Sequence, residues 1–205
     1  GLPAAVGIIV LSTPIVEFLY RNMEGAEAAA TGNLLAILSI GVIFLTLIQT
    51  LTAILQGVDR VIVPVRNLAI GAAFKIVLTI VLVGIPSINI QGAAIGTLVC
   101  YGIAAMLDFI AVLKYARIRF SITEFLIKPV IAAGAMGLGV FLTYRYSFEA
   151  MASNTKSTLL SIIVGMVLYV IMVFATGMVK RQDLEMIPGG EKLIGILDKL
   201  GLLRA

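Results

Sequence analysis

The sequence has 205 residues, of which 60% are hydrophobic and 13% are charged, whereas a soluble domain has roughly 45–50% apolar and about 25% charged residues. This composition excludes a soluble globular domain and a disordered segment, and it predicts a membrane protein. With no histidine and one cysteine, Cys100, we expect no metal centre and no cofactor, and the net charge of +4 is not taken to indicate a nucleic-acid partner.

Six stretches are long and apolar enough to cross a hydrocarbon core of about 30 Å as helices. They cover residues 2–20, 34–56, 62–84, 92–113, 125–144 and 157–179. Pro14 and Pro129 are expected to kink or start helices, and Pro64 fits a first helical turn. The sequence enters the first stretch without the charged region and cleavage site of a signal peptide, so we expect it to be part of a longer chain. The predicted fold is an all-α polytopic membrane bundle.

Basic residues are distributed unequally between the two sets of predicted loops. One side carries Arg60, Arg66, Lys114, Arg117, Arg119, Lys128, Lys180 and Arg181, and the other side carries Arg21, Arg145 and Lys156. Because Lys and Arg that flank spans are retained on the cytoplasmic side, both ends of this sequence are predicted to be cytoplasmic.

A second kind of segment follows the sixth stretch. The predicted transmembrane bundle covers residues 1–180, and a cytoplasmic tail covers residues 181–205. After Pro188-Gly189-Gly190, apolar residues recur at helical spacing on one face: Leu193, Ile196, Leu197, Leu200 and Leu203. This pattern predicts an amphipathic helix, which either lies at the lipid headgroups or caps the bundle.

Lys75 is the polar residue that is hardest to place in a membrane. It lies about 20 Å into the third stretch, where a charge costs on the order of 3 kcal/mol. It either pairs with carbonyl groups or with an acid elsewhere in a longer chain, or it faces a hydrated cavity. Asn67, Gly71, Lys75 and Thr79 follow one another at four-residue spacing, so they share one helix face. The cavity alternative therefore predicts a helix that lines a pathway.

Two other stretches carry stripes of polar or small residues. In the second stretch the stripe contains Thr46, Gln49, Ala53 and Gln56. It predicts either hydrogen bonds between helices or a substrate role for Gln49 and, more weakly, Gln56. In the fourth stretch, the residues at four-residue steps are Gly92, Gly96, Cys100, Ala104 and Asp108. The small residues, together with Gly71, predict close helix packing, whereas Asp108 is either a solvated or Lys-paired carboxylate or an ion-coupling group.

The residues also resemble a known family. The matching runs are ILQGVDR at 54–60, VPVRNL at 63–68, GAAFK at 71–75, INIQGAAIGT at 88–97 and RQDLEMIPGG at 181–190. In this order and spacing they resemble polysaccharide biosynthesis proteins of the stage V sporulation protein B type. The resemblance implies the multidrug, oligosaccharidyl-lipid and polysaccharide exporter (MOP) superfamily, which is MATE-like and includes the lipid II flippase of cell-wall synthesis.

This resemblance implies a two-lobe transporter of about fourteen spans in the bacterial plasma membrane, with this sequence as spans nine to fourteen. Its partners would be membrane lipid, the N-terminal lobe of the same protein and a lipid-linked saccharide, which would cross by alternating access. Lys75, with Asn67 and Arg66, would hold a pyrophosphate-linked headgroup. Two alternatives stay open: a cation-coupled drug exporter that uses Asp108, and a membrane scaffold for cell-wall enzymes. The sequence offers no catalytic constellation, so an enzyme is not expected.

Overall fold

The computed structural model describes residues 1–20, 22–23, 25–116 and 127–177. These residues form seven α-helices, as the all-α prediction requires, and the chain divides into two compact units, Gly1–Phe120 and Ser121–Ala205. The N-terminal unit contains α1 (Leu2–Val10), α2 (Ser12–Leu19), α3 (Ala26–Gly57), α4 (Ile62–Val83) and α5 (Gln91–Tyr115). The C-terminal unit contains α6 (Lys128–Met151) and α7 (Asn154–Ala175).

The first predicted span is a bent pair of short helices. The axes of α1 and α2 differ by 74° across Leu11. Pro14 explains the position of the break, because its ring clashes with the carbonyl of Val10, four residues earlier, and it has no N–H to donate there. Leu11 itself is 2% exposed, so the bend is buried. The expected kink at Pro14 is therefore present.

Helix α3 starts eight residues before the predicted start at Leu34. Residues 26–33 are less apolar than the rest of the helix, but they include Ala26, Ala28, Ala29 and Ala30, and alanine is the strongest helix former. Hydropathy located the apolar part of the helix and missed this extension. The 32 residues of α3 make a helix about 48 Å long, which exceeds a hydrocarbon core of about 30 Å.

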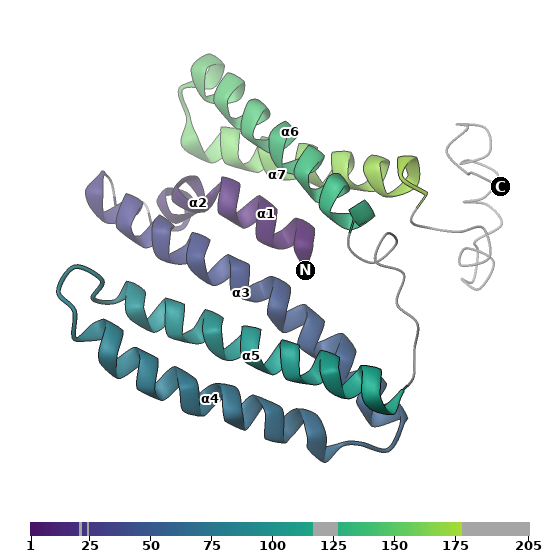
Figure 1. The fold of residues 1–205 in the computed structure, drawn as a ribbon. Helices are drawn as coiled ribbons and strands as arrows, with labels where there is room; N and C mark the ends of the chain where they lie inside the picture. The colour runs from purple at the N-terminus through teal and green to yellow at the C-terminus, as the bar shows by residue number, and fades with distance from the viewer. Residues whose placement is uncertain (21, 24, 117–126, 178–205) are drawn as a thin grey trace. The chain divides into compact units, whose positions relative to one another are not determined.

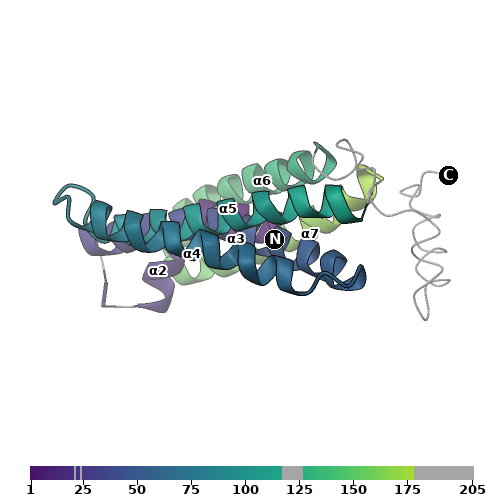
Figure 2. The same cartoon turned by 60° about the horizontal axis from the view of Figure 1, so that its bottom comes forward.

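Helix α5 lies between α3 and α4, and the three run side by side (Figures 1 and 2). Helices α1 and α2 pack on α3. One buried cluster joins α3 to α5 through Leu51, Leu55, Ala111 and Val112. A second cluster contains Ile48, Ala104 and Ala105, with Phe44 and Tyr101 packed against it. Because lipid tails are as apolar as these side chains, their close packing rather than their removal from water stabilises this layer.

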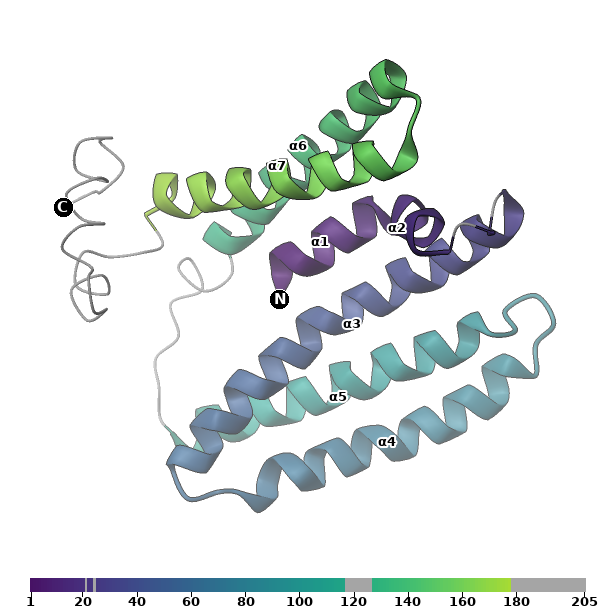
Figure 3. The same ribbon diagram turned by 180° about the vertical axis from the view of Figure 1, so that it is seen from behind.

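The C-terminal unit is a hairpin of α6 and α7 (Figure 3). Pro129 lies in the first turn of α6, where its missing N–H costs nothing. The turn passes through Ala152, which has a positive φ of 47°. The buried residues of the hairpin are mostly small: Ala132, Ala133, Met136, Gly137, Val140 and Ser147 on α6, and Ser157, Thr158, Ser161 and Gly165 on α7.

The number of spans differs from the sequence prediction. Within the described residues, four helices are long and apolar enough to cross a membrane, namely α3, α4, α5 and α7, and the bent α1–α2 pair makes a fifth if it counts as one span. The predicted six spans are therefore wrong by this criterion. Helix α6 is absent from the set because it is on average less apolar than the four helices that qualify.

Part of the prediction concerns residues that the structure does not describe. The boundary at residue 180 and the amphipathic helix lie outside the described ranges. The same holds for Arg21, Arg117, Arg119, Lys180 and Arg181 of the charge comparison. The domain division and the orientation across the membrane therefore stay predictions.

Candidate functional site

The hairpin of α4 and α5 contains most of the predicted site residues, and glycines bring its two backbones close together. A Cβ atom added at Gly71 would lie 2.5 Å from the carbonyl oxygen of Cys100. Added at Gly92, it would lie 2.7 Å from the Cβ of Leu82, and added at Gly96, 2.7 Å from the Thr79 hydroxyl. A side chain at Gly71 or Gly92 would meet backbone atoms and require the neighbouring helix to move, whereas at Gly96 the Thr79 side chain would have to shift. The glycines therefore set the distance between α4 and α5.

Asn67 and Asp108 form a buried polar pair across this hairpin. The side-chain amide of Asn67 on α4 donates a hydrogen bond of 2.8 Å to Oδ1 of Asp108 on α5. The exposed fraction is 4% for Asn67 and 0% for Asp108. The second carboxylate oxygen, Oδ2, is also buried and has no hydrogen-bond partner in the described part of the chain. Among the described residues, Asp108 is thus neither exposed to solvent nor paired with a lysine.

Lys75 lies two turns beyond Asn67 on the same helix. Its side chain is half-buried, and within the described residues it forms neither a hydrogen bond nor an ion pair. Its own backbone carbonyl faces Gly96 of α5, since a Cβ added there would lie 3.4 Å from that oxygen. The Lys75 ammonium is thus attached to a helix that packs closely on its neighbour, while its charge has no protein counter-ion in the described residues.

The predicted stripe on α4 faces α5. Asn67 and Gly71 are buried, Lys75 and Thr79 are half-buried, and the Thr79 hydroxyl has no hydrogen-bond partner in the described residues. The opposite face of α4 carries the exposed residues Ile76, Val77, Ile80 and Val81. This helix therefore has one face in contact with protein and one apolar face open to its surroundings.

The other predicted site residues do not join this group. Gln49 and Gln56 are exposed on α3, and Arg66 is exposed on α4. No hydrogen bond or ion pair links any of the three to Asn67, Lys75 or Asp108 within the described ranges. Thr46, in the same stripe as Gln49, donates from its hydroxyl to the carbonyls of Val42 and Ile43 in its own helix, at 3.1 and 3.0 Å.

Two polar groups were missed by the sequence analysis. On the C-terminal hairpin, Tyr144 and Thr158 both donate to Oδ1 of Asn154, at 2.9 and 3.1 Å. The four-residue spacing of Ser157, Ser161 and Gly165 was the signal that could have identified this face as a packing surface.

The second missed group lies where α3 and α5 end. Arg60 and Lys114 both lie over the ring of Tyr115. Lys114 is next to Tyr115 in the sequence, but the approach of Arg60 to the same ring depends on the packing of α3 against α5, which the sequence pattern does not give.

The described residues contain no cluster of three or more His, Cys, Asp or Glu side chains that could hold a metal ion.

The chain is distantly similar to two bacterial membrane proteins. It is 26% identical over 199 residues to the uncharacterized membrane protein YabM of Bacillus subtilis (strain 168), which covers 94% of this chain and 36% of YabM. It is 28% identical over 154 residues to the lipid II flippase MurJ of the same organism, which covers 70% of this chain and 28% of MurJ. No family model matches the chain, and no solved structure matches it. The chain therefore spans about a third of the length of these curated relatives, and it is a multi-pass membrane protein distantly similar to them.

Proposed function

We propose that this chain is part of a MOP-superfamily transporter in the bacterial plasma membrane that moves a lipid-linked oligosaccharide or peptidoglycan precursor by alternating access. The similarity to a protein named as a lipid II flippase, over 70% of this chain, supports the proposal. The N-terminal lobe of the same protein would form the other side of the pathway. Both ends of this sequence would then lie in the cytoplasm, in accord with the distribution of basic residues.

The observation that carries the proposal is Lys75, a half-buried cation that has no counter-ion in the described residues and lies well inside a candidate span. Such a charge costs on the order of 3 kcal/mol at the centre of a membrane. An anionic pyrophosphate headgroup would offset this cost, because charges attract strongly where the dielectric constant is low. Arg66, which is exposed about two turns closer to the predicted cytoplasmic end, is suited to attract the headgroup before it reaches Lys75.

The rest of the predicted pathway has a narrower role in this proposal. Asn67 is already engaged by Asp108, so it positions the two helices, while the exposed Gln49 and Gln56 of α3 offer hydrogen bonds to sugar hydroxyls. The substrate would therefore contact one central cation and a polar surface on α3.

The test is headgroup movement by the full-length protein in proteoliposomes that contain lipid II or an undecaprenyl-pyrophosphate glycan. We expect Lys75→Ala to lower the rate at least about tenfold, which corresponds to a loss of about 1.4 kcal/mol, and Lys75→Arg to retain part of it because the charge remains. Lys156→Ala is the matched control, since Lys156 is an exposed cation outside the α4–α5 hairpin. Equal rates in wild type, Lys75→Ala and Lys156→Ala would contradict the proposal, as would the absence of any movement.

A second candidate function is a cation-coupled drug exporter of the same superfamily. The observation that favours it is the buried Asp108, whose Oδ2 has no hydrogen-bond partner in the described residues, because a buried carboxylate can exchange a proton or Na⁺ during transport. Drug resistance that rises with expression and disappears in Asp108→Asn would support this function. The control is Glu149→Gln, an exposed carboxylate on α6. Resistance that does not respond to expression would exclude it.

A further inference from the structure

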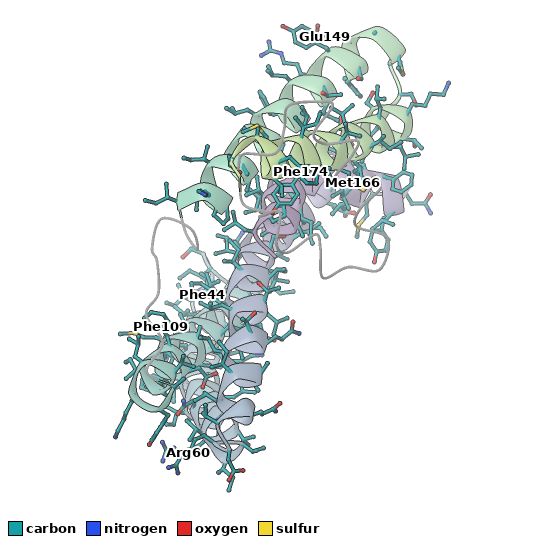
Figure 4. The ribbon with its side chains drawn as sticks, turned by 90° about the vertical axis from the view of Figure 1, so that its right-hand side faces the viewer. Phe44, Arg60, Phe109, Glu149, Met166 and Phe174 are labelled. Carbon is teal, nitrogen blue, oxygen red and sulfur yellow. The ribbon has the colours of Figure 1, made fainter. Side chains whose placement is uncertain are left out.

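Two cations lie over one tyrosine ring where α3 and α5 end. The guanidinium carbon of Arg60 is 4.8 Å from the centroid of the Tyr115 ring, and the Lys114 ammonium is 5.5 Å from it. All three residues are exposed. Figure 4 shows Arg60 at the end of the N-terminal unit. Both distances lie within the range of an attraction between a cation and an aromatic ring.

The fold determines the position of these side chains. The N–H of Arg60 donates to the carbonyl of Leu55 at 2.8 Å, and Asp59 before it takes a positive φ of 60°. This is the hydrogen bond that closes a helix C-terminus, so the backbone of Arg60 is fixed to the end of α3. Leu55 and Val112 are both 0% exposed and pack in the cluster that joins α3 to α5. Tyr115 follows Val112 by one turn, so the same core holds the ring near Arg60.

The electrostatics of the cluster favour an anion. Arg60 and Lys114 carry like charges at one ring, and neither forms an ion pair with a carboxylate in the described residues. Asp59 is the acidic residue nearest in sequence, and it is exposed and likewise forms no ion pair within the described residues. Two cations held together without a counter-ion repel each other, and a phosphate group placed between them would remove that repulsion.

The surroundings indicate that this phosphate belongs to a lipid. The two residues after Arg60 and the start of α4 present apolar side chains, with Ile62 79% and Val65 67% exposed. Leu113, the neighbour of Lys114, is 46% exposed. Tyrosine, with an apolar ring and a polar hydroxyl, is typical of the boundary between lipid and water. Basic clusters next to spanning helices bind anionic headgroups there.

We propose that Arg60, Lys114 and Tyr115 form a binding site for the phosphate of an anionic phospholipid, whose acyl chains lie along Ile62, Val65 and Leu113. This site goes beyond the proposed transport function, since a bound membrane lipid would hold the ends of α3 and α5 together whatever substrate the transporter carries. It lies on the predicted cytoplasmic side, where the two cations count among the retained positive charges.

The test is a titration of the purified full-length protein in detergent with phosphatidylglycerol, with bound lipid counted by native mass spectrometry. We expect Arg60→Gln combined with Lys114→Gln to weaken binding about 25-fold, because each cation at a membrane surface contributes about fivefold to the affinity for anionic lipid. The matched control combines Arg145→Gln with Lys156→Gln, which removes the same charge from exposed cations of the C-terminal hairpin. The control should bind as the wild type does.

Other outcomes of the titration distinguish this lipid site from a general effect of charge and from a site for free phosphate. Equal weakening in both double variants, or equal binding of phosphatidylglycerol and phosphatidylcholine, would overturn the proposal. Glycerol phosphate that competes as well as the whole lipid would show a free-phosphate site instead and would also overturn it. If the double variant of Arg60 and Lys114 does not fold, lipid binding by Tyr115→Leu and Tyr115→Phe tests the site instead. Only the phenylalanine keeps a ring for the cations, so Tyr115→Leu should bind more weakly than Tyr115→Phe. Binding that is unchanged in Tyr115→Leu would then contradict the site.

Discussion

At the scale of single residues, the pair formed by Asn67 and Asp108 connects sequence to packing most directly. The hydrogen bond of 2.8 Å satisfies one buried donor and one of the two carboxylate oxygens. A buried polar group that loses its partner bears its full desolvation cost, about 1–3 kcal/mol, whereas the net gain from forming the bond is smaller. The pair therefore matters to stability mainly through what its removal leaves behind.

Two replacements of Asp108 should separate the desolvation cost of an unpartnered Asn67 amide from the net gain of the hydrogen bond. Asp108→Leu leaves the Asn67 amide buried without an acceptor, so we expect a loss of about 1–3 kcal/mol in the free energy of unfolding. Asp108→Asn keeps an oxygen acceptor at the same place and should cost less than half as much. The measurement is reversible unfolding of the full-length protein in mixed micelles, with the exposed Asp59→Asn as control. Identical losses in Asp108→Leu and Asp108→Asn would show that the charge, and not the hydrogen bond, stabilises the hairpin.

At the scale of secondary-structure elements, the α4–α5 hairpin depends on glycines that face the partner helix. Gly71 faces the Cys100 carbonyl, and Gly96 faces Thr79. Gly102 lies in the same helix as Gly96, but a Cβ atom added there would meet nothing within 4 Å. Glycine therefore has two different effects in this hairpin. At Gly71 and Gly96 it allows the two helices to approach closely, whereas at Gly102 it only lowers the helix propensity of α5.

Alanine substitutions at these glycines should have opposite effects on stability. Gly71→Ala forces the two backbones apart and should destabilise the protein by about 1–3 kcal/mol. Gly102→Ala gains helix propensity without a clash and should be neutral or stabilise it by up to about 1 kcal/mol. Thermal unfolding of both variants in detergent checks this difference. A Gly71→Ala protein as stable as Gly102→Ala would contradict the close approach of α4 to the Cys100 carbonyl.

How far the sequence predicted the elements depended on their composition. Helices α4 and α5 begin and end within two residues of the apolar stretches at 62–84 and 92–113, because continuous hydrophobicity and helix length coincide there. For α3 and α6 the helix extends into less apolar segments, where local helix propensity rather than hydropathy determines the end.

The site was harder to predict than the helices. The spacing of Asn67, Gly71 and Lys75 identified one face of a helix. It did not show that this face meets α5 or that Asp108 is the hydrogen-bond partner of Asn67. Such a contact depends on tertiary packing that spacing along one helix does not encode.

At the scale of the whole molecule, the seven described helices divide into two units. Lys75 belongs to the N-terminal unit, and the C-terminal hairpin has its own buried polar face at Ser157, Thr158 and Ser161. Within the N-terminal unit the loop between α3 and α4 and the loop between α4 and α5 lie at opposite ends (Figures 1 and 2). If α4 spans the membrane, these two loops must lie on opposite sides of it.

Site-directed labelling can test that arrangement and its predicted direction. In a full-length protein without other cysteines, Ser87→Cys in the loop between α4 and α5 should react with an impermeant maleimide on intact cells. Asp59→Cys in the loop between α3 and α4 should react only after the membrane is opened, because basic residues are retained on the cytoplasmic side. Both side chains are exposed, so access to the reagent is not limited by packing. The reverse pattern would invert the topology, and labelling of both on intact cells would remove α4 as a span.

The bend at Leu11 also has a consequence for the biogenesis of the protein. Helices α1 and α2 have nine and eight residues, so each is only about 14 or 12 Å long, less than half a bilayer core. Helix α2 rests on α3 at Gly32, where an added Cβ would lie 2.9 Å from the Cα of Thr13. As a nascent chain leaves the ribosome, this broken segment emerges before the helix on which it rests. We therefore expect stable insertion of this broken segment into lipid to depend on the presence of α3.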